Sequence, residues 1–359
     1  MDKISYWHFH RDDFTRKLVT SIEVGATQCF TIFAPRRVGK TEFLNYDLKP
    51  ALIKDNCEVI YYSFYSNPAD SAIRLFMDEL RKNINVSLLS KLKVTEISTP
   101  WCKVNLKLQD LTELSILELI TILTHQNYKN KKHLVFLFDE IQELLNIPDA
   151  SGFIGGLRTA LDLNKEFLSV VFTGSSQDGL QKMFNDRRAP FFHFSMNLQM
   201  PLLGKEFTDF LAQRYKERTK SKIDGDELYL VFEKLGFITE YIRSIITMLT
   251  LEPKLTITEA YTRLISNLNN SDRLEYQWSK LSAIEKALCH WITAGNSTFY
   301  TEDFKMFALN TYEVDTTQGK IQYAINKLQQ HDILTTNMED ILVIENEFFR
   351  DWIRSNILV

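Results

Sequence analysis

Residues 34–41 read Ala-Pro-Arg-Arg-Val-Gly-Lys-Thr and directly follow the apolar run Cys29-Phe30-Thr31-Ile32-Phe33. They fit the pattern G-x-x-x-x-G-K-[ST] at every fixed position except the first, where Ala34 replaces Gly. In such a loop, backbone N–H groups surround phosphate oxygens at a helix N-terminus, the Lys reaches the β- and γ-phosphates, and the Thr hydroxyl binds Mg²⁺. The stretch therefore predicts a strand, a phosphate-binding loop and a helix, and with them a site for ATP or a similar nucleotide.

The chain around this loop alternates short apolar runs with helical stretches. We expect strands at 26–33, 57–64, 133–138, 168–172 and 191–196, and helices at 39–54, 69–85, 110–127 and 152–164. Short apolar strands that alternate with helices indicate an α/β fold with a parallel sheet covered on both faces. From about 202 to 266 the pattern becomes entirely helical, whereas residues 86–109 follow no clear pattern.

A pair of carboxylates supplies the second half of a nucleotide signature. Asp139 and Glu140 follow the buried run 135–138 directly. An Asp at that strand end can hold the Mg²⁺ that Thr41 also binds, so we expect Thr41 and Asp139 to be the metal ligands. Glu140 is suited to orient or deprotonate the attacking water. The alternative is an acidic helix N-cap after a core strand, which the upstream phosphate loop disfavours.

Two further groups downstream suit phosphoryl chemistry. The strand at 168–172 leads into Thr173-Gly174-Ser175-Ser176, and one hydroxyl of Thr173 or Ser175 could contact the γ-phosphate or the water. The alternative is an ordinary turn with a Ser N-cap. Arg187 and Arg188 precede Phe191, and one of them could stabilise charge on a transferring phosphoryl group, unless both are surface arginines. We therefore expect catalysis to involve Asp139, Glu140, Ser175 and Arg188.

Composition sets the class of protein. The chain has 359 residues, of which 45% are apolar and 25% charged, and a net charge of −4 gives no sign of a polyanion-binding protein. Four cysteines without a C-x-x-C pair read as reduced thiols of a cytoplasmic protein. The N-terminus does not read as a signal peptide, and no apolar stretch reaches about 18 residues, so we expect no membrane contact.

Together these motifs resemble the archaeal-type P-loop ATPases of the STAND/AAA+ group. The resemblance rests on Pro35–Thr41, on Leu157-Arg158, on the segment Phe172–Ser176 and on Pro190-Phe191. The stretch 9–14, Phe-His-Arg-Asp-Asp-Phe, is similar to a box that lies near the adenine in that family, although His10 replaces its Gly. Within 236–242 only Gly236 and Tyr241 match the turn of the family's helical lid. Arg243 could be a sensor of the lid, although a helix-surface arginine is the favoured interpretation.

The resemblance implies a sheet of strand order 5-1-4-3-2, a helical lid and a C-terminal winged helix. It places a P-loop ATPase core at 1–201, the lid at 202–272 and the winged helix at 273–359. It also implies ATP and Mg²⁺ as cofactors. The residues that we expect to contact the nucleotide are Pro35, Arg36, Arg37, Val38, Gly39, Lys40, Thr41, Glu42 and Arg11.

The C-terminal segment supports this last domain by its own pattern. Helices are expected at 283–291, at 302–309 and from 316, followed by a hairpin of 333–336 and 341–344, which is the winged-helix plan. Residues 280–359 carry seven Lys or Arg and eleven Asp or Glu, a net charge of −4. Because phosphate contacts supply most non-specific DNA affinity, this charge favours protein docking over direct DNA contact.

Three functions stay open on the sequence. The first is an ATP-hydrolysing molecular switch that couples its nucleotide state to a partner, or to its own association, through the winged helix. The second is a DNA-associated adaptor in which ATP is mainly structural. The third, which rests on the resemblance alone, is an ATPase component of a prokaryotic defence or mobile-element system that acts with a separate effector. The pair His8 and His10 has no further ligand close in the sequence, so we expect a solvated or nucleotide-proximal pair rather than a metal site.

Overall fold

The computed structural model divides the described chain into two compact units, and each is treated separately. The first holds the described residues up to Leu203, and the second holds those from Gly204. The described residues are all except 1–5, 26, 66–68, 86–95, 99–102, 106–110, 148, 175–179, 181–182, 185–188, 190, 269–270, 338–340 and 359.

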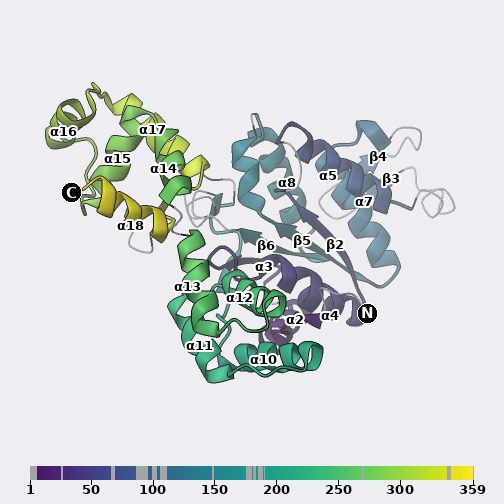
Figure 1. Ribbon diagram of the computed structural model, residues 1–359. Coiled ribbons are helices and arrows are strands. Elements are labelled where there is room, and N and C mark those ends of the chain that lie inside the picture. Colours follow the sequence, from purple (N-terminus) through teal and green to yellow (C-terminus); the bar gives the residue numbers. More distant parts are fainter. Residues whose placement is uncertain are drawn as a thin grey trace. The chain divides into compact units, whose positions relative to one another are not determined.

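A five-stranded sheet forms the centre of the first unit (Figure 1). In spatial order its strands are β2 (Cys57–Ser63), β5 (His133–Asp139), β6 (Leu168–Gly174), β1 (Cys29–Phe33) and β7 (Met196–Gln199). Every neighbouring pair is parallel. Numbered along the chain this is the order 2-3-4-1-5, which is the expected order 5-1-4-3-2 read from the other edge, so the predicted fold class is confirmed.

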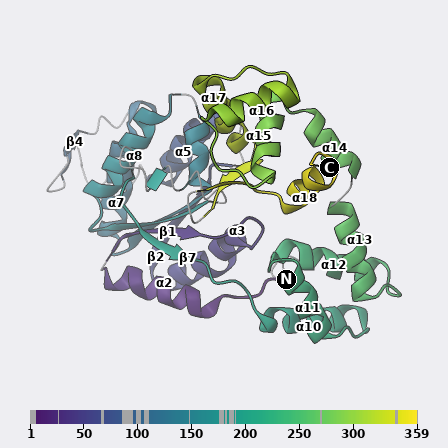
Figure 2. The same cartoon turned by 90° about the vertical axis from the view of Figure 1, so that its left-hand side faces the viewer.

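Helices cover both faces of this sheet, as Figure 2 shows from the side. One face carries α5 (Ala69–Asn83), α7 (Ile116–Lys129) and α8 (Ser151–Leu163). The other face carries α2 (Asp12–Val24), α3 (Lys40–Glu42), a π-helical segment (Phe43–Leu48) and α4 (Lys49–Lys54). Short elements complete the unit: the hairpin β3 (Glu96–Ser98) and β4 (Lys103–Asn105), and the 3-10 segments Leu111–Glu113 and Ile141–Asn146.

Alternation along the interior strand β5 explains why both faces of the sheet are apolar. On β5, Phe136 and Phe138 belong to the core under α5, α7 and α8, whereas Val135 and Leu137 belong to the core under α2 and α4. All four side chains are 0% exposed. Successive side chains of a strand point to opposite faces, so a continuous apolar run is what a strand buried on both sides needs.

Two expectations about element boundaries were wrong. The fifth strand runs over Met196–Gln199, not over 191–196, because Phe191 is fully buried and packs on Phe172 and Phe184 outside the sheet. The helix expected at 39–54 is three consecutive pieces with a π-helical segment in the middle. π-Helical turns are rare and occur often at functional sites.

The second unit is built of helices and one small hairpin. Its elements are α10 (Lys205–Thr219), α11 (Gly225–Lys234), α12 (Thr239–Leu251), α13 (Ile257–Leu268), α14 (Ser271–Ser279), α15 (Ala283–Thr293), α16 (Glu302–Tyr312), α17 (Gln318–Gln330), β8 (Leu334–Thr336), β9 (Leu342–Ile344) and α18 (Glu347–Asn356). A core of its own, from Leu274 to Ile353, unites the last five helices with the hairpin. Helix α18 was not expected from the sequence.

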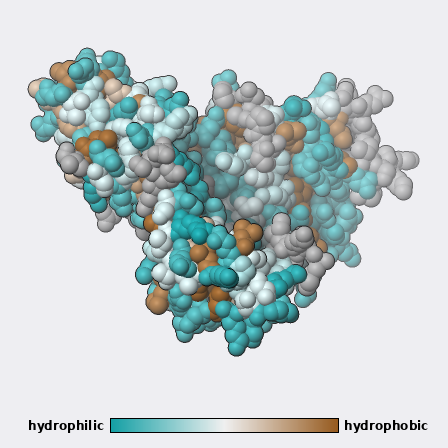
Figure 3. Space-filling view, in the orientation of Figure 1, coloured by the Kyte–Doolittle hydropathy of each residue, from teal (hydrophilic) through white to brown (hydrophobic). Residues whose placement is uncertain are grey.

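The molecular surface in Figure 3 is mostly hydrophilic, as the share of charged residues in the sequence leads us to expect. On the face shown in Figure 3, hydrophilic residues cover most of the surface and hydrophobic ones lie in small groups. Within the described part of the chain, no helix has the length and apolar character needed to cross a membrane. Three of the four cysteines, Cys29, Cys57 and Cys289, are buried free thiols, and Cys102 lies outside the described residues.

Candidate nucleotide site

The loop 34–41 connects β1 to α3 at the carboxyl edge of the sheet. Its backbone turns through two left-handed residues, Arg37 with φ of 63° and Gly39 with φ of 92°, before α3 begins at Lys40. Left-handed φ is accessible to glycine without a steric cost, which accounts for Gly39 at this position. Val38 is buried and anchors the loop, whereas Pro35 and Arg37 are exposed and Arg36 is half-buried. The sequence thus folds into the strand–loop–helix order that its motif predicts.

Lys40 folds back over the loop that precedes it. Its Nζ atom donates hydrogen bonds to the carbonyl oxygens of Ala34, at 3.0 Å, and Pro35, at 2.9 Å. The residue is only 6% exposed, so these carbonyls hold the ammonium group inside the curve of the loop. An ammonium group held there by neutral acceptors can exchange them for phosphate oxygens, which form stronger charge-assisted hydrogen bonds.

Asp139 collects three hydroxyl donors at the end of β5. Thr41 Oγ1 donates to its Oδ2 at 2.6 Å, and Tyr61 on β2 donates to the same oxygen at 3.1 Å. Thr173 at the end of β6 donates to Oδ1. The carboxylate is 1% exposed. Burial, followed by the negative charge of Asp139, raises the pKa of Tyr61 to about 12, so this phenol stays a donor at neutral pH.

Glu140 lies beside this cluster in a left-handed backbone conformation, with φ of 53°. Its Oε2 accepts a hydrogen bond of 2.5 Å from Nε2 of Gln142, which itself is 3% exposed. A Cβ atom at Gly174 would lie 2.2 Å from Oε1 of Gln142, so glycine leaves room for this amide at the end of β6. Glu140, the carboxylate expected to activate water, therefore accepts a hydrogen bond from Gln142. The side chain of Gln142 in turn fits only because residue 174 on β6 is a glycine.

Arg11 stabilises the loop through hydrogen bonds to backbone carbonyls. Its guanidinium donates to the carbonyl oxygens of Val38, at 2.8 Å, and of Pro201, so it joins the loop to the residues after β7. Burial lowers the pKa of Arg11 to about 10, although the nearby carboxylates of Asp47 and Glu42 oppose that shift. Its expected contact with the nucleotide stays a prediction.

The remaining expected residues are placed as follows. Glu42 is half-buried, and its Oε2 lies 3.4 Å from Nδ1 of His8. Ser175, Arg187 and Arg188 lie outside the described residues. Arg158 on α8 stacks its guanidinium 3.9 Å from the ring centre of Phe194, and Arg243 is on α12 of the second unit.

Two residues of this site were missed in the sequence. Tyr61 sits in a run of aromatic residues that reads only as a core strand, and Gln142 sits in a short 3-10 segment with no motif. The signal for Tyr61 is its alternation on β2. In the parallel pair of β2 and β5, Ser63 lies opposite Asp139. Tyr61 is two residues before Ser63 on β2, so both side chains lie on the same face of the sheet.

Comparison with known proteins supports the fold. No protein-family model matches the sequence, and no curated protein sequence matches it. Among solved structures, a Walker-type ATPase of Pyrococcus abyssi is similar with a TM-score of 0.61 at 16% identity, over 97% of this chain and 96% of that one. The ORC2 protein of Aeropyrum pernix in its ADP form is similar with a TM-score of 0.55 at 14% identity, over 97% and 93%. Together with the strand order, these likenesses show that the chain has the fold of the AAA+ P-loop ATPases.

Proposed function

We propose that this protein binds ATP with Mg²⁺ at the carboxyl edge of its sheet and hydrolyses it. One observation carries the proposal: the buried carboxylate of Asp139 is bound by Thr41 of the phosphate loop and by Thr173 of the neighbouring strand. The loop, the acidic strand end and the hydroxyl of the next strand thus converge on one point. A chance match to the loop pattern would not bring the other two to it.

The oxygen atoms gathered there fit Mg²⁺. This ion prefers carboxylate and hydroxyl oxygens and keeps several waters, and Thr41 with Asp139 offers one hydroxyl and one carboxylate. The ion, when bound with the nucleotide, neutralises charge that develops on the phosphates. Lys40 would exchange its two carbonyl partners for phosphate oxygens, and the backbone of Arg36–Gly39 would surround them.

Glu140 would hold the attacking water and take its proton, with Thr173 or Ser175 near the γ-phosphate and Arg188 as the arginine that stabilises developing charge. The experiment that tests this assignment compares ATP turnover by Glu140→Gln and by the wild type. Loss of a general base lowers turnover by about 10²- to 10⁴-fold. Binding of ATP, followed by calorimetry, should stay close to that of the wild type.

Glu143 supplies a matched control. It is a second half-exposed carboxylate on the same 3-10 segment, and its Oε1 lies 3.4 Å from the amide nitrogen of Gln142. Glu143→Gln removes the same charge three residues away and should retain turnover. Equal turnover by wild type and Glu140→Gln, with ATP bound by both, would remove the assigned role.

Helices α10–α13 would act as the lid of a STAND/AAA+ switch, and the part from α14 to α18 as its winged helix. Three of the five helices that share this apolar core, α15, α16 and α17, are followed by the hairpin of β8 and β9, and this order supports the second assignment. In this proposal the nucleotide state changes how the protein associates with itself or with a partner. Measurement of its mass in solution with and without a non-hydrolysable ATP analogue tests that coupling, and identical masses would count against self-association.

A DNA-associated adaptor in which ATP is mainly structural is the second candidate that the sequence leaves open. The polar contacts of α17 favour docking of a protein over direct contact with DNA. Lys327 pairs with Glu285 at 2.8 Å, and Gln322 donates to Asn326 at 3.0 Å, so these polar groups have partners within the unit. A salt-dependent shift of duplex DNA at low ionic strength would favour the adaptor, and no shift would exclude it.

A further inference from the structure

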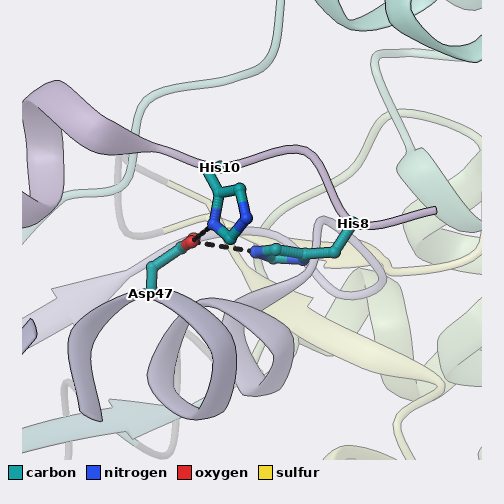
Figure 4. A group of neighbouring side chains, drawn as sticks. All are labelled: His8, His10 and Asp47. Carbon is teal, nitrogen blue, oxygen red and sulfur yellow. Dashed lines mark hydrogen bonds and ion pairs between the residues drawn. The ribbon is translucent and has the colours of Figure 1, made fainter. Parts of the chain in front are cut away.

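Three side chains from two distant segments meet beside the helix that follows the phosphate loop (Figure 4). Oδ1 of Asp47 lies 2.9 Å from Nε2 of His8 and 2.6 Å from Nδ1 of His10. Each of the three residues offers one possible metal-ligand atom, and these three atoms all lie within 4.8 Å of one another. The sequence offered only the two histidines, because Asp47 is 37 residues from His10 along the chain.

Neighbouring groups fix the rings and the carboxylate. His8 and Asp47 are each 6% exposed, and the two imidazoles lie edge to face with centres 4.8 Å apart. The backbone N–H of Arg11 approaches Oδ2 of Asp47 at 3.4 Å. Asp47 belongs to the π-helical segment, where the ordinary helical repeat is interrupted. Oδ1 is thereby left facing both histidines.

Glu42 gives His8 a second carboxylate neighbour, an arrangement shared by metal-binding histidines and by protonated ones in ion pairs. Its Oε2 lies 3.4 Å from Nδ1 of His8, while Nε2 of the same ring faces Asp47. A histidine that binds a metal through one nitrogen usually donates the N–H of the other to a carboxylate, which fixes the tautomer and the ring orientation. Glu42 stands in that relation to His8.

We propose that Nε2 of His8, Nδ1 of His10 and Oδ1 of Asp47 bind one divalent transition-metal ion, of which Zn²⁺ is the best match. Two imidazoles and one carboxylate form a three-ligand site that leaves a fourth position for water. Imidazole nitrogens favour Zn²⁺ and its neighbours over Mg²⁺, which prefers an all-oxygen shell. The site shares no ligand with the Thr41 and Asp139 pair.

Small adjustments would bring the atoms to ligand geometry. Ligands about 2.05 Å from a tetrahedral ion are about 3.3 Å apart. The two distances to Asp47, 2.9 and 2.6 Å, must therefore widen slightly. His10 can make this movement because its side chain is 56% exposed, whereas His8 and Asp47 are held by their surroundings.

An ion at this site would tie the segment before α2 to the helix after the phosphate loop. The same segment carries Arg11, whose guanidinium binds the carbonyl of Val38 in that loop. The alternative is that His8 and Asp47 form only a buried ion pair with the same structural role and bind no metal. The two accounts differ in one measurable quantity, the stoichiometry of metal bound without nucleotide.

The test uses the full chain, stripped with a chelator and free of nucleotide, in buffer with excess Mg²⁺. Zn²⁺ is titrated in competition with a chromophoric chelator, and Co²⁺ serves as a spectroscopic probe of the ligand geometry. We expect one equivalent of Zn²⁺ per chain, unaffected by Mg²⁺. His10→Ala should weaken binding by more than about tenfold, because loss of a direct ligand costs at least as much affinity as loss of a group that hydrogen-bonds to a ligand.

Matched variants separate the site from other histidines and from unfolding. His331→Ala removes an exposed imidazole in the second unit and should bind Zn²⁺ like the wild type. Glu42→Gln keeps the size of the side chain, loses the charge, and should weaken binding by about 10- to 100-fold. Circular dichroism confirms that each variant is folded. The proposal is overturned if wild type binds no equivalent of Zn²⁺, or if His10→Ala and wild type bind it equally.

Discussion

Thr41 and Asp139 stand 98 residues apart in the chain and share a hydrogen bond of 2.6 Å, in which the hydroxyl donates to Oδ2 of the carboxylate. The contact joins the first turn of the helix after the phosphate loop to the end of the interior strand β5. It places the two expected metal ligands in direct contact.

Replacement of Lys40 by Ala should weaken ATP binding by about 10- to 100-fold. A hydrogen bond to a charged group contributes about 1.5–3 kcal/mol, which is that range in affinity. Calorimetric titration with ATP and Mg²⁺ measures the effect. Lys54→Ala, at the exposed end of α4, is the control and should bind ATP like the wild type. Unchanged affinity in Lys40→Ala would contradict the assigned contact with phosphate.

Thr173→Val should reduce both stability and ATP turnover. The new side chain keeps the shape of threonine but leaves a buried oxygen of Asp139 without its donor, at a cost of about 1–3 kcal/mol. Thr31→Val is the matched control. Thr31 is an equally buried threonine on β1, and its hydroxyl bonds to Ser195 instead of Asp139. Denaturant unfolding should show a loss in both variants, and only Thr173→Val should lose turnover.

Gln142→Met should lower kcat for ATP while the affinity for ATP stays the same. Methionine retains the length of the side chain but cannot donate to Glu140. A hydrogen bond to a charged group contributes about 1.5–3 kcal/mol, so the loss is about 10- to 100-fold in rate if the whole contribution is made in the transition state. Steady-state kinetics at saturating and limiting ATP separate the two quantities. A change in KM with constant kcat would show that Gln142 acts on binding and not on Glu140.

Acid should destabilise the second unit through Glu285. Burial raises the pKa of this carboxyl, but Lys327 and the N–H of Ser282 outweigh it, and the folded pKa lies below the usual 4.5. A lowered pKa means that the unfolded chain binds the proton more readily. The stabilisation is therefore present above about pH 4.5 and is lost as the pH falls through the folded value.

Lys327→Met isolates this contribution. It removes the ammonium group that lies 2.8 Å from Glu285 and keeps the long apolar stem. Thermal unfolding between pH 3 and pH 7 should show a weaker pH dependence for Lys327→Met than for the wild type. Parallel curves for the two proteins would show that the pair contributes nothing to acid sensitivity.

Local patterns in the sequence were sufficient for the strands around the site. The run 135–138 is apolar throughout because β5 is buried on both faces, and the loop motif fixes where β1 ends and α3 begins. The fifth strand was predicted at the wrong residues because a buried apolar run does not always form a strand. Phe191 is aromatic because it fills a core with Phe172 and Phe184, whereas the true strand, Met196–Gln199, is mostly exposed.

Contacts over long sequence separations were not accessible in this way. Nothing near His8 and His10 in the sequence indicates Asp47, because the contact depends on how the π-helical segment turns. The bond from Gln142 to Glu140 spans only two residues, but Glu140 has a left-handed backbone there, and no local pattern signals such a conformation at a non-glycine residue.

The order of strands also bears on how the protein is made. β1 pairs only with β6 and β7 in the described sheet, so Cys29 has its nearest partner at Val170. A nascent chain on the ribosome therefore has no neighbour for β1 until about residue 174 has emerged. Contacts of such long sequence separation form slowly and late. The nucleotide site proposed at the loop 34–41 is therefore incomplete until about 130 later residues, up to the end of β6 at Gly174, have been synthesised.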